Sequence, residues 1–532
     1  MKLFRPALAL SSLALLLGCP GKTAPSEPRN VLLITLDTTR ADYLSVNGFH
    51  RETSPKLDEL AASGVNFSRA MSSSAVTPVS HATILTGRFP DKHGLRVLAA
   101  RGGFRLPEDV PTLAQILKDR GYRTGAIHSA FPVSKVFGFA RDYDYFDSVE
   151  ATFLRQQKRD EESGELVEDE SSQRVGWDVK NFQRRSDATT DKALAWLEGR
   201  KTDEAPWFLW LHYWDPHDPK KTPPRDFLDR EAITMTRKGR YTSGYDEFYA
   251  EEIRYMDSQI GRVLDALRES GDYSETVTVL TADHGEGLYD GEDDHGWPAH
   301  RELYRQQINV PLILHLPDRE EDAGKQFQDL VRTADVFPTV LDSLGFRIPE
   351  EVDGASLIPL LEGRSGGSRL HYAEQINGYD FNASMIDKRP IADFIYSVMD
   401  DDWKLIYRPN HPEASELFQH SIDPGEKNNL WESEPEQRLR LLKELAKRES
   451  WVTTFFPHIE LTAEETEGVE AALSGLGYIG TEPEDGEVKT FDDEPEYDWA
   501  WTCPGEEEVV FDEPGWCETA DCPRILVRKP ER

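Results

Sequence analysis

Continuous apolar runs that alternate with amphipathic segments constrain the fold of this chain more than any other feature. Each run is short enough for a β-strand and apolar on both faces, as the strands of a sheet covered on both sides are. The runs cover residues 31–36, 125–130, 207–214, 276–281 and 310–316. They predict an α/β fold with a large mixed, mostly parallel sheet flanked by helices.

Amphipathic helices are predicted between these strands. Residues 246–270 give the clearest case, because apolar side chains recur there at helical spacing and Gly271 closes the segment. Weaker helical patterns cover residues 111–120 and 188–198. The apolar face of the clearest helix holds Ile253, Met256, Ile260, Val263, Leu264 and Leu267.

The chain divides into five predicted parts. Short strands at 403–407 and 416–418 and a helix at 434–449 predict a smaller C-terminal α+β subdomain. The parts are a signal peptide (1–19), a flexible tether (20–29), a large domain (30–364), the C-terminal subdomain (365–450), and a helical segment with an acidic, partly disordered tail (451–532). Cys503, Cys517 and Cys522 lie in that tail, and their odd number permits one disulfide of open pairing.

The first 19 residues have the pattern of an export signal. Lys2 and Arg5 precede an apolar stretch at 7–17, which is too short to span a bilayer. The end of this segment, Leu-Leu-Gly-Cys at 16–19, resembles a bacterial lipoprotein signal and implies a lipid on Cys19. We therefore expect an exported protein, lipid-anchored to a membrane of the bacterial cell envelope, in the periplasm or at the outer membrane. A cleaved signal with an unlipidated cysteine is the alternative.

The charge balance argues against nucleic acid as a partner. The chain has 97 Asp and Glu against 61 Lys and Arg, for a formal net charge of −36. Such a surface repels polyanions at long range. A polyanionic substrate would therefore need a local basic pocket.

Polar side chains follow the apolar runs at the points where the strands end. Asp37 follows the first run, Asp283 and His284 follow the fourth, and His212, Asp215 and His217 lie within or after the third. The carboxyl ends of parallel strands line the ligand crevice of an α/β sheet, so these groups should converge. Two carboxylates and an imidazole suit a divalent metal ion. Buried, hydrogen-bonded Asp residues are the alternative for each position taken alone.

A loop at 75–87 that turns into a helix carries the candidate nucleophiles. A helix N-terminus offers free amides to an anionic ester group. A hydroxyl beside a metal ion can be ionised there and can attack such an ester. Thr77, Ser80 and Thr83 are the hydroxyl candidates, and a Ser/Thr helix cap is the alternative.

Ordered motifs between residues 30 and 430 resemble the sulfatase family of the alkaline phosphatase superfamily. T-P-V-S-H at 77–81, followed by L-T-G-R at 85–88, is similar to the family signature, in which Cys or Ser heads a C/S-x-P-S-R motif that runs into L-T-G. The other similar pieces are N-V-L-L-I-T-L-D at 30–37, G-Y-R-T at 121–124, W-F-L at 207–209, D-P-H at 215–217, T-A-D-H-G-E at 281–286, V-P-L at 310–312, E-L-F at 416–418 and D-P at 423–424. The resemblance implies an alkaline phosphatase-like fold, a sulfatase-like catalytic domain at 30–364, and one divalent ion.

The chain departs from the family at its central residue. Thr77 stands at the nucleophile position, where true sulfatases convert Cys or Ser to formylglycine, a conversion not known for threonine. His81 replaces the motif arginine, and Thr38 replaces an Asp that binds metal in many members. The remaining set resembles the phosphodiesterase-like branches of the superfamily, some of which use an unmodified threonine. That resemblance implies Thr77 as the nucleophile.

The resemblance assigns roles to a small set of residues. Calcium is the ion that the family implies, and His284 leaves manganese or zinc open. His295 is the alternative to His300, because the family pattern matches only to within one residue there. The expected metal ligands are Asp37, Asp283 and His284, and the expected catalytic residues are Thr77, His81, His217 and His300.

We expect a metal-dependent hydrolase of sulfate or phosphate esters that acts on a small-molecule or glycan ester. A phosphoethanolamine-type transferase shares the scaffold and the threonine, but such transferases carry several membrane helices that this sequence lacks. An exported, non-catalytic binding lipoprotein on a sulfatase fold is the other alternative. The joint presence of Asp37, Thr77, Asp283 and His284 argues against it, because a binding protein needs no nucleophile over a metal.

Overall fold

The computed structural model describes the two folded sheets of the chain and several short strands outside them. Residues 1–28, with the predicted signal and Cys19, lie outside the described part, as do Cys503, Cys517 and Cys522. The predictions on those segments stay predictions. The described residues are 29–98, 105–149, 182–201, 203–217, 223–227, 245–288, 295, 300–364, 367–377, 389–448 and 471, with short strands at 153–155, 158–159, 166–167, 174–177, 499–502 and 525–528.

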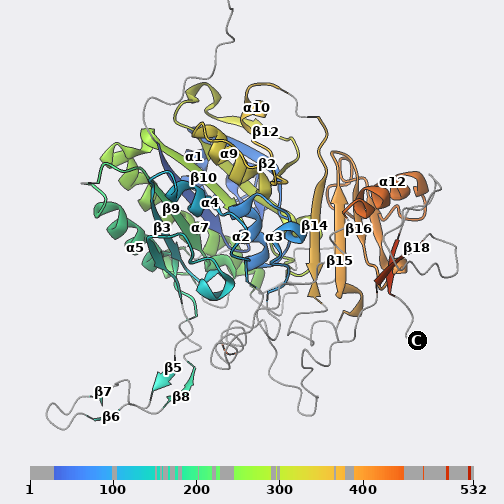
Figure 1. The fold of residues 1–532 in the computed structure, drawn as a ribbon, viewed down its shortest axis with the longest axis horizontal. Helices are drawn as coiled ribbons and strands as arrows, with labels where there is room; N and C mark the ends of the chain where they lie inside the picture. Colours follow the sequence, from blue (N-terminus) through green and yellow to red (C-terminus); the bar gives the residue numbers. More distant parts are fainter. Residues whose placement is uncertain are drawn as a thin grey trace, which may run out of the picture.

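A nine-stranded mixed sheet forms the main body, and its parallel part confirms the predicted fold class (Figure 1). The strand order is β12-β2-β11-β10-β1-β9-β3-β4, with β13 also paired to β2. β10, β1, β9, β3 and β4 run parallel, whereas β11 is antiparallel to both β10 and β2. The strands are β1 (Asn30–Leu36), β2 (Val65–Met71), β3 (Arg123–His128), β4 (Tyr145–Asp147), β9 (Trp207–Tyr213), β10 (Thr276–Ala282), β11 (Asn309–His315), β12 (Lys325–Phe327) and β13 (Val331–Arg332).

All five predicted runs form strands of this sheet, and the bounds of four of them agree with the prediction to within one residue. The run predicted at 125–130 forms β3, which begins and ends two residues earlier. The prediction missed Arg123 and Thr124 because they are polar, but both pair with the neighbouring strand at Trp207 and Phe208. The chain leaves the sheet after His128. β2 was not predicted, since polar residues interrupt its sequence VNFSRAM and leave no continuous apolar run.

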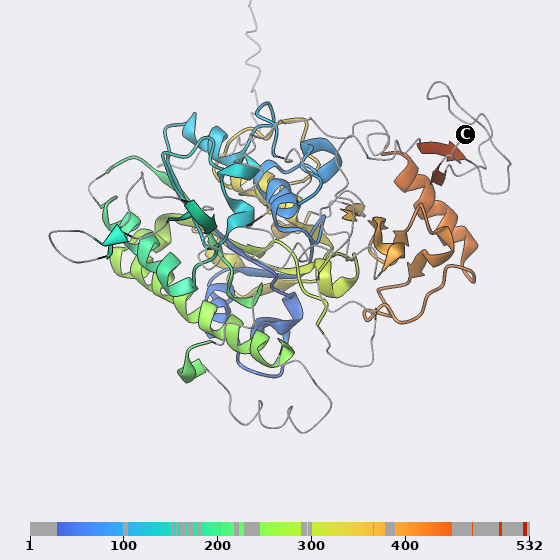
Figure 2. The same cartoon turned by 90° about the horizontal axis from the view of Figure 1, so that it is seen from below.

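Helices cover both faces of the sheet. Figure 2 shows α7 and α1 on one face, and the helices of residues 77–118 on the other. The longest, α7, confirms the predicted amphipathic helix: its apolar residues from Ile253 to Leu267 are buried. The helices of this body are α1 (Pro55–Ala62), α2 (Thr77–Thr86), α3 (Pro90–His93), α4 (Leu113–Lys118), α5 (Ser186–Glu198), α7 (Tyr245–Ser270), α8 (Arg305–Ile308), α9 (Val336–Ser343) and α10 (Ile358–Leu361).

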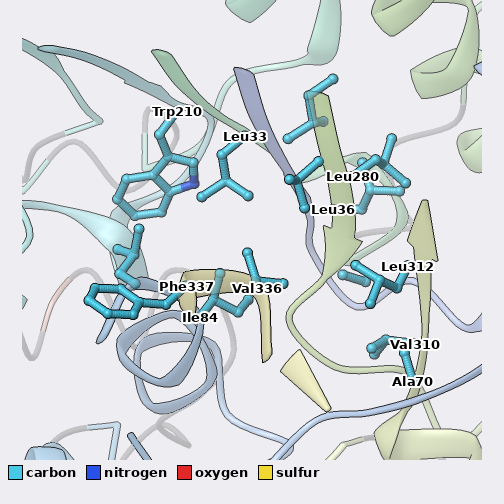
Figure 3. Packing of buried hydrophobic residues seen from close by; sticks show 14 of the residues in the cluster. Leu33, Leu36, Ala70, Ile84, Trp210, Leu280, Val310, Leu312, Val336 and Phe337 are labelled. Carbon is cyan, nitrogen blue, oxygen red and sulfur yellow. The ribbon is translucent and has the colours of Figure 1, made fainter. Parts of the chain in front are cut away.

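Helix α2 is buried along its whole length between the sheet and α9. In Figure 3, Ile84 lies beside Phe337 and Val336, with Leu33 and Trp210 on the sheet above them. Burial of an aliphatic or aromatic side chain of this size contributes about 1.5–3 kcal/mol. The packing therefore fixes α2, and with it the candidate nucleophile at its first residue.

A four-stranded antiparallel sheet and a helix form the C-terminal part, which confirms the predicted α+β subdomain and adds two strands, β14 and β15, to the two that were predicted (Figure 1). β14 lies nearest the main body and contacts the loop before α2, where the amide of Glu374 donates to the carbonyl of Ser73 at 3.0 Å. The Glu374 side chain also forms a buried ion pair with Arg96. The elements are β14 (His371–Ile376), β15 (Phe394–Met399), β16 (Lys404–Tyr407), β17 (Glu416–Phe418) and α12 (Pro435–Ala446).

The remaining described strands form two-stranded sheets. β18 and β19 pair antiparallel inside the segment predicted as a partly disordered tail, where the sequence analysis expected no strand. Among the described residues, no helix is long and apolar enough to cross a membrane. The paired strands are β5 (Phe153–Arg155) with β8 (Arg174–Trp177), β6 (Lys158–Arg159) with β7 (Leu166–Val167), and β18 (Trp499–Thr502) with β19 (Ile525–Arg528).

Candidate active site

Asp37 and Asp283 meet because their strands are parallel neighbours in register. Leu36 pairs with Ala282 at the last position of the β1–β10 ladder, so the next residue of each strand is an aspartate. The amide of Asp283 donates to the carbonyl of Leu36 at 3.1 Å. Both carboxyl groups are fully buried. The predicted convergence at the carboxyl edge of the sheet is therefore present.

Thr38 links the two carboxylates. Its amide donates to Oδ1 of Asp283 at 3.0 Å, and its hydroxyl donates to Oδ1 of Asp37 at 2.5 Å. It reaches both from a left-handed backbone conformation, with φ of 52°. A non-glycine residue in that region carries strain of about 1–3 kcal/mol, which is common at functional sites. Thr38 thus orients the two acids.

The donor set fits a divalent cation. Ligand atoms of Asp37, Asp283 and His284 lie within 4.8 Å of one another, and Oδ2 of Asp283 is buried without a hydrogen-bond partner. Burial raises the pKa of Asp37 well above its usual range, and burial together with the Asp37 charge does the same for Asp283. Two buried carboxylates facing each other are costly unless a cation compensates them. These residues would hold the ion.

His284 presents one nitrogen to this group. The carbonyl of Gly285 accepts from Nδ1 at 2.9 Å, which leaves the lone pair of Nε2 available. Nε2 lies 3.6 Å from Oδ2 of Asp283 and 3.3 Å from Oγ1 of Thr77. Gly285 is required here, because a Cβ at its position would lie 2.1 Å from the carbonyl oxygen of Gln306.

The structure separates the three hydroxyl candidates on α2. Thr77, the first residue of the helix, faces His284. The hydroxyl of Ser80 instead donates to the carbonyl of Ser74 at 2.8 Å, and that of Thr83 donates to the carbonyl of Val79. Ser80 therefore holds the loop before the helix. Thr77 is the hydroxyl beside the metal ligands.

His81 lies beside Asp283, and both of its ring nitrogens are in hydrogen bonds. Nδ1 donates to the carbonyl of Thr77 at 2.8 Å, and Nε2 lies 3.0 Å from the hydroxyl of Thr35. Burial and the neighbouring His212 lower the pKa of His81 well below its usual value, so the ring is neutral. His81, His212 and Asp283 also lie within 4.8 Å of one another. Because the protein already occupies both nitrogens of His81, the set with Asp37 and His284 is the better metal site.

His300 lies beside His284, and His217 lies beside His300. The ring of His300 is 4.7 Å from that of His284 and 5.2 Å from that of His217. His217 is fixed by stacking on Trp214 at 3.8 Å. His295 stacks on Tyr304 and lies 3.2 Å from the carbonyl of Gly425. Of the two histidines left open by the sequence, His300 is thus the one beside the metal group.

Three residues of the site were not in the predicted set. Nε2 of His212 donates to Oδ2 of Asp37 at 3.1 Å, and its place at the end of a buried strand was the signal for it. Glu286 is buried 3.5 Å from Nδ1 of His300, and burial raises its pKa to about 8. It belongs to the same D-H-G-E motif as the metal ligands. Arg301, buried with φ of 117°, gave no sequence signal.

Burial holds the imidazoles of the site neutral. It lowers the pKa of His300 and of His212 to about 3, and the charge of Arg301 adds to the effect at His300. Burial is also the main cause that lowers the pKa of His217 and the pKa of His284 well below the usual value. A neutral imidazole can accept a proton or donate its N–H. The site thus offers two carboxyl groups that can hold a cation, a hydroxyl, and neutral imidazoles beside them.

This fold and this group of side chains are typical of an ester hydrolase with a buried site that fits a divalent ion. Family comparison agrees: the profile described as Sulfatase matches residues 29–346, and the profile described as N-sulphoglucosamine sulphohydrolase, C-terminal, matches residues 292–450. The chain belongs to the sulfatase family and is a sulfatase-family ester hydrolase.

Curated relatives and solved structures match along most of their length. The chain is 25% identical to an N-acetylglucosamine-6-O-sulfatase of Bacteroides thetaiotaomicron over 83% of this chain and 89% of that one. It is 26% identical to an arylsulfatase of Clostridium perfringens, over 80% and 96%. The phosphonate monoester hydrolase structure of Agrobacterium radiobacter is similar in fold, with a TM-score of 0.58 at 19% identity, over 80% and 96%.

Proposed function

We propose that the chain hydrolyses sulfate esters with the unmodified hydroxyl of Thr77 as nucleophile. The observation that carries this proposal is the position of Oγ1 of Thr77, 3.3 Å from Nε2 of His284 and beside the two buried carboxylates. A helix cap would not require a hydroxyl at that point. Matches to a family of sulfate ester hydrolases support the reaction type.

The chain's own residues divide the work of the reaction. The Thr77 oxygen attacks sulfur, the bond from sulfur to the alcohol oxygen breaks, and a sulfated threonine forms. The proton that Thr77 loses passes to the leaving alkoxide, and the neutral imidazole of His300 or His217 can accept it and release it there. Water then attacks the same sulfur and frees Thr77. The sum is ester plus water giving alcohol, sulfate and a proton.

A bound divalent cation would supply charge stabilisation and favour the ionised form of a neighbouring hydroxyl. Asp37, Asp283 and His284 would hold it. Calcium is the ion that the family resemblance implies, whereas a nitrogen ligand from His284 suits manganese or zinc. Metal analysis of the protein as purified decides between them.

We propose sulfated glycans or small aryl sulfates as the substrate class. The names of two relatives, an N-acetylglucosamine-6-O-sulfatase and an arylsulfatase, support it. The test is hydrolysis of matched aryl sulfate, phosphate monoester, phosphodiester and phosphonate substrates with Ca²⁺, Mn²⁺ or Zn²⁺ added. Fastest turnover of the sulfate is the expected result. Faster turnover of any phosphorus ester would instead assign the chain to a phosphate ester hydrolase.

We also propose that the mature protein is lipid-anchored through Cys19 in the bacterial cell envelope. The lipoprotein-like sequence at 16–19 and the Pro-rich segment after it support this location. An envelope location would suit a hydrolase of extracellular glycan esters.

A further inference from the structure

The C-terminal sheet reaches the candidate active site through two buried amide side chains. Gln375 lies near the end of β14, and Asn377 follows it; each is 2% exposed. Oε1 of Gln375 accepts from the amide of Ala75 and from the hydroxyl of Ser74, each at 3.3 Å. Ala75 is two residues before Thr77. One end of this link therefore holds the loop that leads into the nucleophile helix.

The other end of the link holds the segment that carries His300. Nε2 of Gln375 donates to Oδ1 of Asn377 at 2.8 Å. Nδ2 of Asn377 in turn donates to the carbonyl of Arg301 at 2.9 Å and to that of Ala392 at 2.6 Å. Arg301 has a φ of 117°, a conformation that a non-glycine residue keeps only where its surroundings impose it. The bond from Asn377 is such a constraint.

We propose that Gln375 and Asn377 are positioning residues that set the distance between Thr77 and His300. This inference rests on the proposed function, in which Thr77 attacks and His300 protonates the leaving group. Every donor and acceptor of the link is buried, so water does not compete for these bonds. The two segments are more than 200 residues apart in sequence, and the link joins them through a third element.

The substitution Gln375→Met tests the link because it keeps the length of the side chain and removes its polar atoms. We expect kcat to fall about 10- to 100-fold, with KM within about threefold, because a small misplacement of reacting groups costs that much. Asn377→Ser should act in the same way. Because both variants break one chain of bonds, the double variant should be no slower than the slower single variant. Multiplying effects, or an unchanged kcat in Gln375→Met, would overturn the proposal.

Ile395→Val is the matched control. Ile395 lies directly opposite Gln375 in the β14–β15 ladder, is buried, and makes no polar link to the site. Its kcat should stay within about twofold of wild type, since one lost methylene weakens the sheet without touching the link. An equal loss of kcat in this control would show that the sheet's stability matters, and the positioning role would be wrong.

Amide hydrogen exchange gives a readout that needs no substrate. Gln375→Met should raise exchange in both segments, 72–77 and 300–305, while Ile395→Val should leave both unchanged. Gln375→Glu keeps an acceptor for Ala75 and loses the donor to Asn377, so only the second segment should exchange faster. If the wild type hydrolyses none of the esters tested but these exchange patterns appear, the proposed function fails and the link stands. If the wild type is active but Gln375→Met leaves exchange in both segments unchanged, the proposed link is wrong and the proposed function stands.

Discussion

The hydroxyl oxygen of Thr77 lies 3.3 Å from Nε2 of His284, although 207 residues separate the two in the chain. Thr77→Ala removes this oxygen and should lower kcat by more than about 1000-fold, while Thr77→Ser, which supplies the same hydroxyl, should retain turnover. Both are measured with the best sulfate ester, and intact-mass analysis should show an unmodified threonine. A Thr77→Ala enzyme that works at the wild-type rate would place the nucleophile elsewhere.

Removal of one carboxylate should weaken the binding of a divalent ion at the candidate metal site. Asp283→Asn takes away the charge on the buried Oδ2 atom and should weaken metal binding more than about 10-fold, since even residues behind a ligand can cost that much. Calorimetric titration of the metal-free protein measures it. Asp215→Asn is the control, because Asp215 is also buried but bonds to Ser186. Equal affinity in wild type and Asp283→Asn would reject the site.

Lipid attachment is tested by Cys19→Ser. The lipoprotein-like sequence predicts that this variant loses its lipid and moves from membrane to soluble fractions after cell lysis. Fractionation with immunoblotting and metabolic labelling with a fatty acid provide the measurement. If Cys19→Ser stays with the membrane, another segment is the anchor.

Acid sensitivity should come partly from His93. Nδ1 of this buried ring accepts from the amide of Leu95 at 3.2 Å, and burial lowers its pKa to about 3. The unfolded chain binds this proton at about pH 6.5, so the stability that the neutral ring contributes is present above that pH and is lost as the pH falls toward 3. Denaturant unfolding at a series of pH values measures the slope. His93→Asn keeps an acceptor that does not titrate and should flatten it; an unchanged slope would exclude His93.

The strand positions and the convergence of Asp37 with Asp283 could be predicted because one physical rule governs both. A strand buried on both faces must be apolar, so an acidic residue directly after it, such as Asp37 or Asp283, stands out. The same rule did not predict β2, because Asn66, Ser68 and Arg69 interrupt its apolar run. The strand nevertheless lies inside the sheet, between β12 and β11.

Contacts between distant segments could not be predicted in the same way. Nothing near Ser80 in the sequence shows that its hydroxyl bonds to Ser74 and faces away from the metal ligands. The choice between His295 and His300 also depended on three-dimensional position, because both follow the same motif. Arg301 and the link through Gln375 depend on a strand of the second sheet, which no local pattern connects to the site.

The order in which the central strands are synthesised makes the metal site a late product of folding. β1 is the first strand among the described residues, yet its two neighbours, β9 and β10, come from residues 207–213 and 276–282. Pairing across such sequence separations is slow, because long loops must close before any contact forms. Asp37 is therefore synthesised long before Asp283, which is added only after more than half of the chain has been made. A ribosome-bound or truncated chain that ends before Asp283 would have no complete binding site for the ion.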